Sequence, residues 1–258
     1  MMVSSDFRTD ARRKLDGKWG KAALISLAYM VIFFVIGFIE GLFPDSMQFI
    51  LSIIVWVIEV PLAFGLIISL FKLFNGEEVK AFDFLGSGFN NFKRSWSVTF
   101  QIILKMIVPV ILVIVSIVLL SIGTAGAIGF GAHSAISTSK VSASVAGGFG
   151  VLGIIGFILY VVSLVWATMK SYYYQLSILV AIDNPEMSTK EAVQKSEELM
   201  QNKRGKLFCL QFSFIGWAIL AVFTLGIGYL WLLPYIQFAT ISFYKNTLGQ
   251  TVEVETKE

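Results

Sequence analysis

Charged residues are scarce in this chain. They make up 14% of its 258 residues, whereas hydrophobic residues make up 56% and the mean hydropathy is +0.78. Soluble domains carry about 25% charged residues, and a soluble fold with so few charges could not cover its own surface. The composition therefore excludes an ordinary soluble protein and indicates an integral membrane protein.

Cysteine and histidine are nearly absent. Cys209, the only cysteine, lies in an apolar run, which excludes a disulfide framework. His133 is the only histidine, and one histidine without cysteines or a carboxylate cluster does not make a metal site. The chain also lacks a phosphate-binding loop, a zinc-protease motif and a nucleophile elbow. We therefore expect no catalytic residue, no cofactor and no metal.

What the sequence does contain is long apolar runs. A membrane-spanning helix needs about 20 mainly apolar residues, and four runs meet this requirement, at 22–43, 48–74, 98–122 and 150–181. A fifth run, 207–244, has no charged residue and as one helix would measure about 57 Å, nearly twice a ~30 Å hydrocarbon core. Gly226 and Gly228 favour an outer turn at 224–228, which would divide this run into spans 207–225 and 229–245.

The positions of the positive charges favour six spans with both termini in the cytoplasm. Cytoplasmic segments of membrane proteins are enriched in Lys and Arg. Apart from Lys105, Lys140 and Lys170, every Lys and Arg falls at Lys72 or in one of four segments, 1–21, 75–97, 182–206 and 245–258. Six spans place all four segments on the same side of the membrane.

Two further segments are polar or small-residue-rich. The outer connection 123–148 is rich in Gly, Ala and Ser, and this composition favours a flexible loop. Its alanines also allow it to lie partly buried against the bundle. The C-terminal tail covers 246–258.

Each pair of spans is preceded by a segment with the spacing of an amphipathic helix, at about 4–18, 80–94 and 188–202. In the third segment, Ser188 and Glu191 form a capping-box pair. Such helices with basic ends lie in the membrane interface. The expected fold is thus an all-α bundle of three hairpins, each preceded by a cytoplasmic interfacial helix. The alternative is that basic flanks and short linkers alone produce this pattern.

Two ionisable residues lie within the expected spans, where they are costly and often functional. Glu59 lies in the second span ahead of Pro61, and Lys105 lies in the third ahead of Pro109. Their depths differ by about 6 Å, so they could pair and line a path for a substrate or ion. Alternatively, Lys105 reaches the cytoplasmic surface and Glu59 is protonated or bonded to the backbone that Pro61 frees. Pro234 is expected to kink the sixth span.

The chain resembles a bacterial family of polytopic membrane proteins known as domain of unknown function 975. The resemblance rests on the following segments, mostly near the C-terminus: Gly17-Lys-Trp19, Ser196-Glu-Glu-Leu-Met200, Leu207-Phe208, Ser213-Phe-Ile-Gly-Trp217, Thr224-Leu-Gly-Ile-Gly228, Trp231, Pro234-Tyr235 and Phe243-Tyr244. One departure is Asn202, where the family pattern has glycine, and asparagine also tolerates a left-handed conformation. The resemblance implies a bacterial integral membrane protein and no particular activity.

Three functions remain open. The first is non-enzymatic transport or export of a small molecule, lipid or peptide through the bundle, motivated by Glu59, Lys105 and the helix breaks. The second is a scaffold or lipid-sensing protein whose interfacial helices dock on a membrane or cytoplasmic protein partner. The third, an intramembrane enzyme, has no supporting motif. We expect the lipid bilayer as a partner, no nucleic acid, and a location in the bacterial cytoplasmic membrane.

Overall fold

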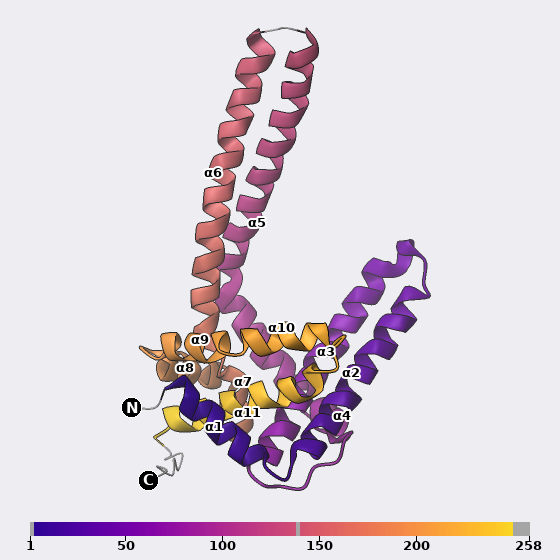
Figure 1. The fold of residues 1–258 in the computed structure, drawn as a ribbon, viewed down its shortest axis with the longest axis vertical. Coiled ribbons are helices and arrows are strands. Elements are labelled where there is room, and N and C mark those ends of the chain that lie inside the picture. Colours follow the sequence, from indigo (N-terminus) through magenta and orange to yellow (C-terminus); the bar gives the residue numbers. More distant parts are fainter. Residues whose placement is uncertain (1–2, 138–139, 250–258) are drawn as a thin grey trace. The chain divides into compact units, whose positions relative to one another are not determined.

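The computed structural model describes residues 3–137 and 140–249, and within them the chain forms helices and turns with no strand (Figure 1). The all-α prediction is therefore confirmed. The helices form two compact units. The first unit combines residues up to Gln101 with those from Tyr173 onward, and the second contains Ile102–Tyr172. The tail expected at 246–258 falls mostly outside the described residues.

The helices follow in the order α1 (Ser4–Leu15), α2 (Trp19–Gly41), α3 (Asp45–Phe74), α4 (Asp83–Asn90), α5 (Phe92–Ser137), α6 (Lys140–Ser171), the short 3-10 helix η1 (Tyr172–Tyr174), α7 (Ser177–Asp183), α8 (Thr189–Met200), α9 (Arg204–Phe212), α10 (Ile215–Phe223) and α11 (Tyr229–Thr247). In the described part of the chain, five stretches are long and apolar enough to cross a membrane: Trp19–Gly41, Asp45–Phe74, Phe92–Gly129, Gly147–Asp183 and Arg204–Phe223. The protein is thus a multi-pass membrane protein. The sixth expected span, 229–245, is not among these five stretches.

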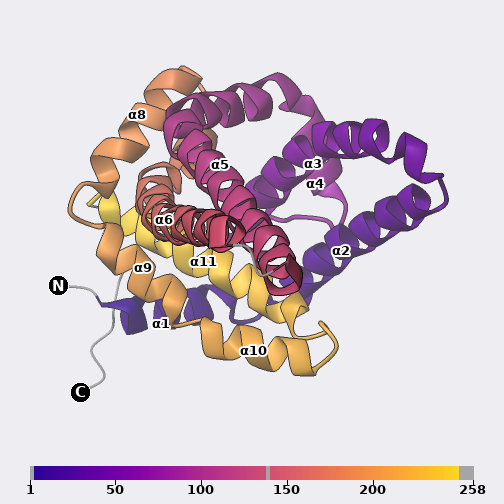
Figure 2. The ribbon, with the colours of Figure 1, turned by 90° about the horizontal axis from the view of Figure 1, so that it is seen from above.

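α11 is the central helix of the first unit. Residues 238–244 of this helix, including Phe238, Phe243 and Tyr244, are buried. Phe7 of α1 packs edge-on against Phe243 with ring centroids 5.3 Å apart, and Phe74 of α3 packs on Phe238 at the same distance. Figures 1 and 2 show α1 lying alongside α11. The apolar stripe expected on α1 therefore contacts α11.

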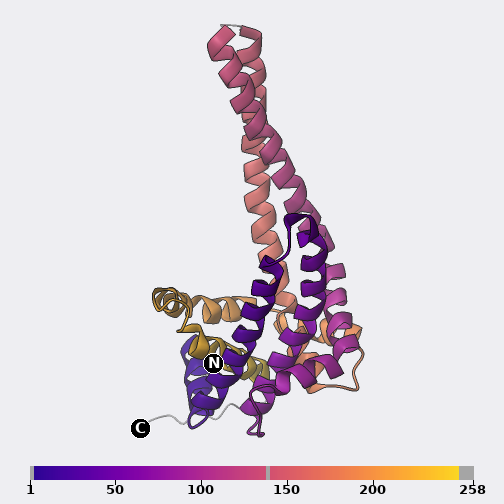
Figure 3. The same cartoon turned by 90° about the vertical axis from the view of Figure 1, so that its right-hand side faces the viewer.

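The hairpins of the first unit do not run in one direction. α2 and α3 lie antiparallel, joined by a short turn, and α10 and α11 form a second pair (Figure 1). In Figure 3 α10 is seen nearly end-on while α2 and α3 are seen along their length, so α10 runs across the α2–α3 hairpin.

α3 and α4 cross in close contact, which glycine makes possible. A side chain at Gly65 of α3 would collide with the backbone of Phe84 and Gly88, and one at Gly88 would collide with the carbonyl of Pro61. Phe84 and Gly88 are accordingly buried, whereas Phe82 and Phe89 are exposed. Phe82 and Phe89 thus lie on the side of this segment that points away from α3.

α8 begins with the capping box that the sequence predicts. Ser188 Oγ accepts from the N–H of Glu191 at 3.3 Å, and the Glu191 carboxylate accepts from the N–H of Ser188 at 3.0 Å. Hydrogen bonding to the Glu191 carboxylate, first from the Ser188 side chain and then from the Ser188 backbone, holds the pKa of Glu191 below its ordinary value. The helix is followed by Asn202 with φ of 59°, which confirms that asparagine takes a left-handed conformation there.

The second unit contains the rest of α5 together with α6. Small residues bring these helices together: a side chain at Gly123 would collide with the backbone of Gly153, and the hydroxyls of Ser116 and Ser163 lie 3.3 Å apart. Pro109 is buried inside α5.

The prediction of a flexible loop at 123–148 is wrong. α5 continues to Ser137 and α6 begins at Lys140, so nearly all of this segment is helical. Alanine is the strongest helix former. Glycines such as Gly123 and Gly126 lie where the two helices touch, because a side chain there would meet Gly153 or Phe149. A Gly- and Ala-rich composition that suggests flexibility in water is thus typical of close helix packing in a membrane.

Candidate functional site

The turn between α10 and α11 shapes one end of a pocket. Residues 224–228 are non-helical, as the sequence predicts. The N–H of Gly226 donates to the Ala221 carbonyl and that of Leu225 to the Val222 carbonyl, both at 3.0 Å, which is the Schellman pattern of a helix end. Gly226 has a φ of 87°, so the turn requires glycine at this position.

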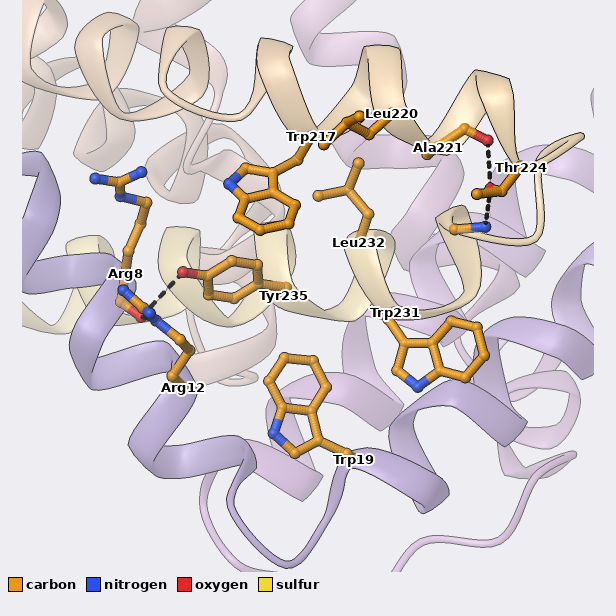
Figure 4. Close-up of a pocket in the computed structure, with 11 residues that line it drawn as sticks. Arg8, Arg12, Trp19, Trp217, Leu220, Ala221, Thr224, Trp231, Leu232 and Tyr235 are labelled. Atoms are coloured by element: carbon orange, nitrogen blue, oxygen red, sulfur yellow. Dashed lines mark hydrogen bonds between the residues drawn. The ribbon is translucent and has the colours of Figure 1, made fainter.

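Gly228 has a different role from Gly226. A side chain there would meet Ala221 at less than 3.0 Å, so this glycine lets α11 start close against α10. The Thr224 hydroxyl donates to the Ala221 carbonyl at 2.8 Å and accepts from the N–H of Gly228 at 2.9 Å (Figure 4). These contacts fix the corner of the hairpin. Pro234 lies buried one turn and a half further along α11.

The pocket lies between α1, the start of α2, α10 and α11, and has a volume of about 440 Å³. Apolar and aromatic side chains line most of it (Figure 4). Its lining residues are Arg8, Arg12, Trp19, Trp217, Leu220, Ala221, Thr224, Gly228, Trp231, Leu232 and Tyr235.

Two arginines supply the positive charge of the pocket. Arg8 and Arg12 are one helical turn apart on α1, and both line the pocket because the neighbouring stripe of α1 is held against α11. The Arg8 Nε atom is buried without a hydrogen-bond partner. In the part of the chain that the structure describes, neither guanidinium is paired with a carboxylate. The pocket therefore holds two positive charges that no acidic residue balances.

Aromatic rings form the facing walls. Tyr235 lies between Trp19, 6.0 Å away, and Phe214, 5.0 Å away, and its hydroxyl donates to the Arg8 carbonyl at 3.4 Å. Trp217 and Trp231 remain about half exposed. Tryptophan with one apolar and one polar edge is typical of the membrane–water boundary.

This set of side chains can bind an anion that carries an apolar part. Guanidinium groups form paired hydrogen bonds to phosphate or carboxylate, and the apolar walls accept a hydrocarbon chain. No carboxylate, histidine or cysteine lines this pocket. Among the described residues, no three His, Cys, Asp or Glu side chains lie close enough together to hold a metal ion.

The two ionisable residues that the sequence singled out within the expected spans lie elsewhere. Glu59 is an exposed residue of α3 in the first unit, and Lys105 belongs to the second unit. Neither lines the pocket, and their pairing stays a prediction. The carbonyl that Pro61 frees, that of Val57, accepts from the Trp96 indole at 3.2 Å, so Glu59 is not needed there.

Sequence reasoning missed Arg8 and Arg12 because it assigned their charges to membrane orientation. A signal was present in their spacing. The four-residue interval repeats that of the neighbouring apolar stripe at Phe7, Ala11 and Leu15, so both sets lie on adjacent faces of one helix.

The pocket brings together segments that the six-span topology separates. Thr224 and Gly228 were predicted at the outer membrane surface, and Arg8 and Arg12 at the cytoplasmic surface, yet all four line this pocket. The sides of the membrane on which these segments lie stay a prediction.

Comparison with known proteins extends the resemblance noted above. The family model described as "Protein of unknown function (DUF975)" matches residues 1–251. No curated protein and no solved structure matches the chain. The segments that carry the resemblance, from Gly17 to Tyr244, all lie in the first unit, which contains the pocket. Since the match covers nearly the whole length, the chain belongs to the DUF975 family of proteins of unknown function.

Proposed function

We propose that this protein is a non-enzymatic membrane protein that binds an anionic phospholipid in the pocket between α1, α10 and α11. The observation that carries the proposal is the pair Arg8 and Arg12, unbalanced by any acidic residue of the pocket, at the edge of an otherwise apolar and aromatic pocket. A soluble anion would contact only the arginines. A phospholipid would contact both the arginines and the apolar walls, with its phosphate on the guanidinium groups and its acyl chain along Trp217 and Leu232.

The proposed location is the cytoplasmic face of the bacterial cytoplasmic membrane, with both termini in the cytoplasm. The basic segments at 1–21 and 182–206 support this orientation. Anionic lipids attract basic residues beside a membrane at about 1 kcal/mol for each Lys or Arg. A lipid-sensing or scaffold role follows, because occupancy of the pocket would join α1 to the α10–α11 pair.

The export hypothesis has less support. It needs Glu59 and Lys105 along a shared path, and neither lines the pocket. It stays a prediction, as does a protein partner for the exposed aromatic stripe of α4.

The proposal is tested by titrating the full-length protein in dodecyl maltoside with phosphatidylglycerol that carries bromine on its acyl chains. Bromine quenches indole fluorescence on contact, so binding gives saturable quenching. Replacing both arginines, in Arg8→Gln/Arg12→Gln, should raise the dissociation constant at least tenfold, because hydrogen bonds to charged groups contribute about 1.5–3 kcal/mol each. The matched control Lys80→Gln/Lys93→Gln removes two exposed charges from outside the pocket and should leave binding unchanged.

Three further arms locate the ligand. Trp19→Phe/Trp217→Phe/Trp231→Phe should remove most of the saturable quenching, since these three indoles line the pocket. Brominated phosphatidylcholine should bind at least tenfold more weakly, and glycerol phosphate should not compete. Equal binding of both lipids, or unchanged binding by the arginine variant, would refute the proposal. Competition by glycerol phosphate would identify a soluble anion as the ligand instead.

A further inference from the structure

The tip of the α10–α11 hairpin is an exposed apolar surface in the part of the chain that the structure describes. Phe223 is 81% exposed, Leu225 94% and Ile227 59%. Leu225 also has a φ of 54°, a left-handed conformation that disfavours a residue with a side chain and that glycine usually fills at this place in a helix end. A strained and fully exposed leucine is unsuited to water and suited to hydrocarbon.

The same surface continues along α9 and α10. A stripe of large apolar side chains, spaced alternately by four and three residues, is exposed on these helices: Phe208, Phe212, Ile215, Ile219 and Val222. The opposite face, with Leu207, Leu210 and Phe214, is buried against the protein. Lys203, Arg204 and Lys206 stand where the stripe begins. A basic end followed by an apolar face is the pattern of a helix that lies in the plane of the membrane.

The contacts of α11 place it at the depth of α1. α1 has six charged side chains among its twelve residues, so it cannot lie in the hydrocarbon core. Two positions of α11 contact adjacent residues of α1, through the Tyr235–Arg8 hydrogen bond and the Phe243–Phe7 ring contact. It also contacts both ends that the α2–α3 hairpin turns toward the cytoplasm, through Trp19 and Phe74. A helix that crosses the bilayer beside α2 and α3 would instead extend toward their turn.

We infer that α9, α10 and α11 do not cross the membrane, and that the hairpin lies along the cytoplasmic surface with Phe223, Leu225 and Ile227 inserted into the phospholipid of the cytoplasmic leaflet. The binding partner of the tip is thus the lipid of the cytoplasmic leaflet. The basic residues at the start of α9 orient the hairpin on this surface. The inference does not depend on a ligand in the arginine pocket. It also fits the charge distribution, because two fewer crossings leave every basic segment on the same side of the membrane.

The test places the fluorophore nitrobenzoxadiazole on single cysteines in a Cys209→Ser background. Ser5→Cys marks α1, Ser46→Cys marks the turn between α2 and α3, and Ile227→Cys marks the tip; all three residues are exposed. Dithionite added outside sealed vesicles of full-length protein destroys only the fluorophores on the outer side. The vesicles are prepared so that the Ser5 and Ser46 labels lose different fractions of their signal, which calibrates the orientation of the protein.

The Ile227 label should lose the same fraction of signal as the Ser5 label. A loss equal to that of the Ser46 label would show that the tip crosses the membrane and would overturn the inference. Depth is measured with phosphatidylcholine that carries a nitroxide on carbon 5 of its acyl chain. This quencher should act at least twofold more strongly on the Ile227 label than on the Ser5 label. Equal quenching of the two labels would place the tip in water and would also refute the inference.

Discussion

The indole N–H of Trp96 donates to the carbonyl oxygen of Val57 at 3.2 Å, across the gap between α5 and α3. Val57 lies four residues before Pro61, so its carbonyl is the one that loses a helical partner because proline has no N–H. Trp56 packs edge-on against the Trp96 ring at 4.8 Å and shields this hydrogen bond. A side chain distant in sequence thus supplies the hydrogen bond that Pro61 cannot donate to the Val57 carbonyl.

Trp96→Phe should destabilise the protein by about 1–3 kcal/mol, the cost of leaving a shielded carbonyl without a partner. Denaturation in mixed micelles of dodecyl maltoside and sodium dodecyl sulfate measures the change. In a Pro61→Ala background the helix supplies its own N–H to Val57, so the same substitution should cost less. An equal cost in both backgrounds would show that ring packing, and not the hydrogen bond, explains the loss.

Gly88→Ala should force α4 away from α3, because the added methyl group would collide with the Pro61 carbonyl. Overpacking of this kind costs about 1–3 kcal/mol. Gly86→Ala is the matched control on the same helix, since open space surrounds Gly86. It should stabilise the helix by up to about 1 kcal/mol through propensity alone. The same unfolding assay compares the two variants, and similar effects of both would contradict the crossing described for α3 and α4.

Asp183→Asn should weaken the end of α11. Asp183 pairs with Lys245 at 3.1 Å and accepts from the Tyr244 hydroxyl at 3.0 Å, and the side chains of the pair are only 23% and 16% exposed. Hydrogen bonds to charged groups contribute about 1.5–3 kcal/mol, so the free energy of unfolding should fall by about that amount. The exposed pair Lys195–Glu198 supplies the control. Glu198→Gln should change stability by less than about 0.5 kcal/mol.

Glu191 should make the stability of α8 depend on pH. Its pKa is lowered from the ordinary value of 4.5, first by the Ser188 side chain and then by the Ser188 backbone. Because the folded pKa is the lower one, the stabilisation is complete above about pH 4.5 and is lost as the pH falls through the folded value. The protection factors of α8 amides, which are exchange rates corrected for their intrinsic pH dependence, should therefore fall on acidification. Ser188→Ala and Glu191→Gln should both flatten this dependence, and an unchanged profile in either variant would contradict it.

Local patterns in the sequence predicted local structure well. The capping box at Ser188 and Glu191, the turn at 224–228 and the left-handed Asn202 all follow from contacts within a few residues. The helical character of 123–148 was missed because the same small residues favour flexible chains in water and tight helix pairs in lipid.

Long-range features could not be read in the same way. The positive-inside rule concerns only the side of the membrane on which a basic segment lies. It therefore allows both a hairpin that crosses the membrane twice and one that stays at the cytoplasmic surface. The pocket joins Arg8 to Tyr235 and Thr224, and nothing in the spacing of these residues indicates that they meet. Trp96 lies in the segment 75–97 that the sequence assigned to the cytoplasm, and its role depends on a proline in a different helix.

The packing of α1 on α11 has a consequence for biosynthesis. Arg8 and Tyr235, whose contact joins the two helices, are 227 positions apart. At about 5–20 residues per second, α1 leaves the ribosome roughly 10–50 s before its partner exists, and until then its apolar stripe has only the membrane surface to contact. A chain truncated before α11 keeps this apolar stripe exposed. Proteases that recognise exposed apolar segments can therefore distinguish it from a chain that contains α11. The core of the first unit can therefore close only after α11 has been translated.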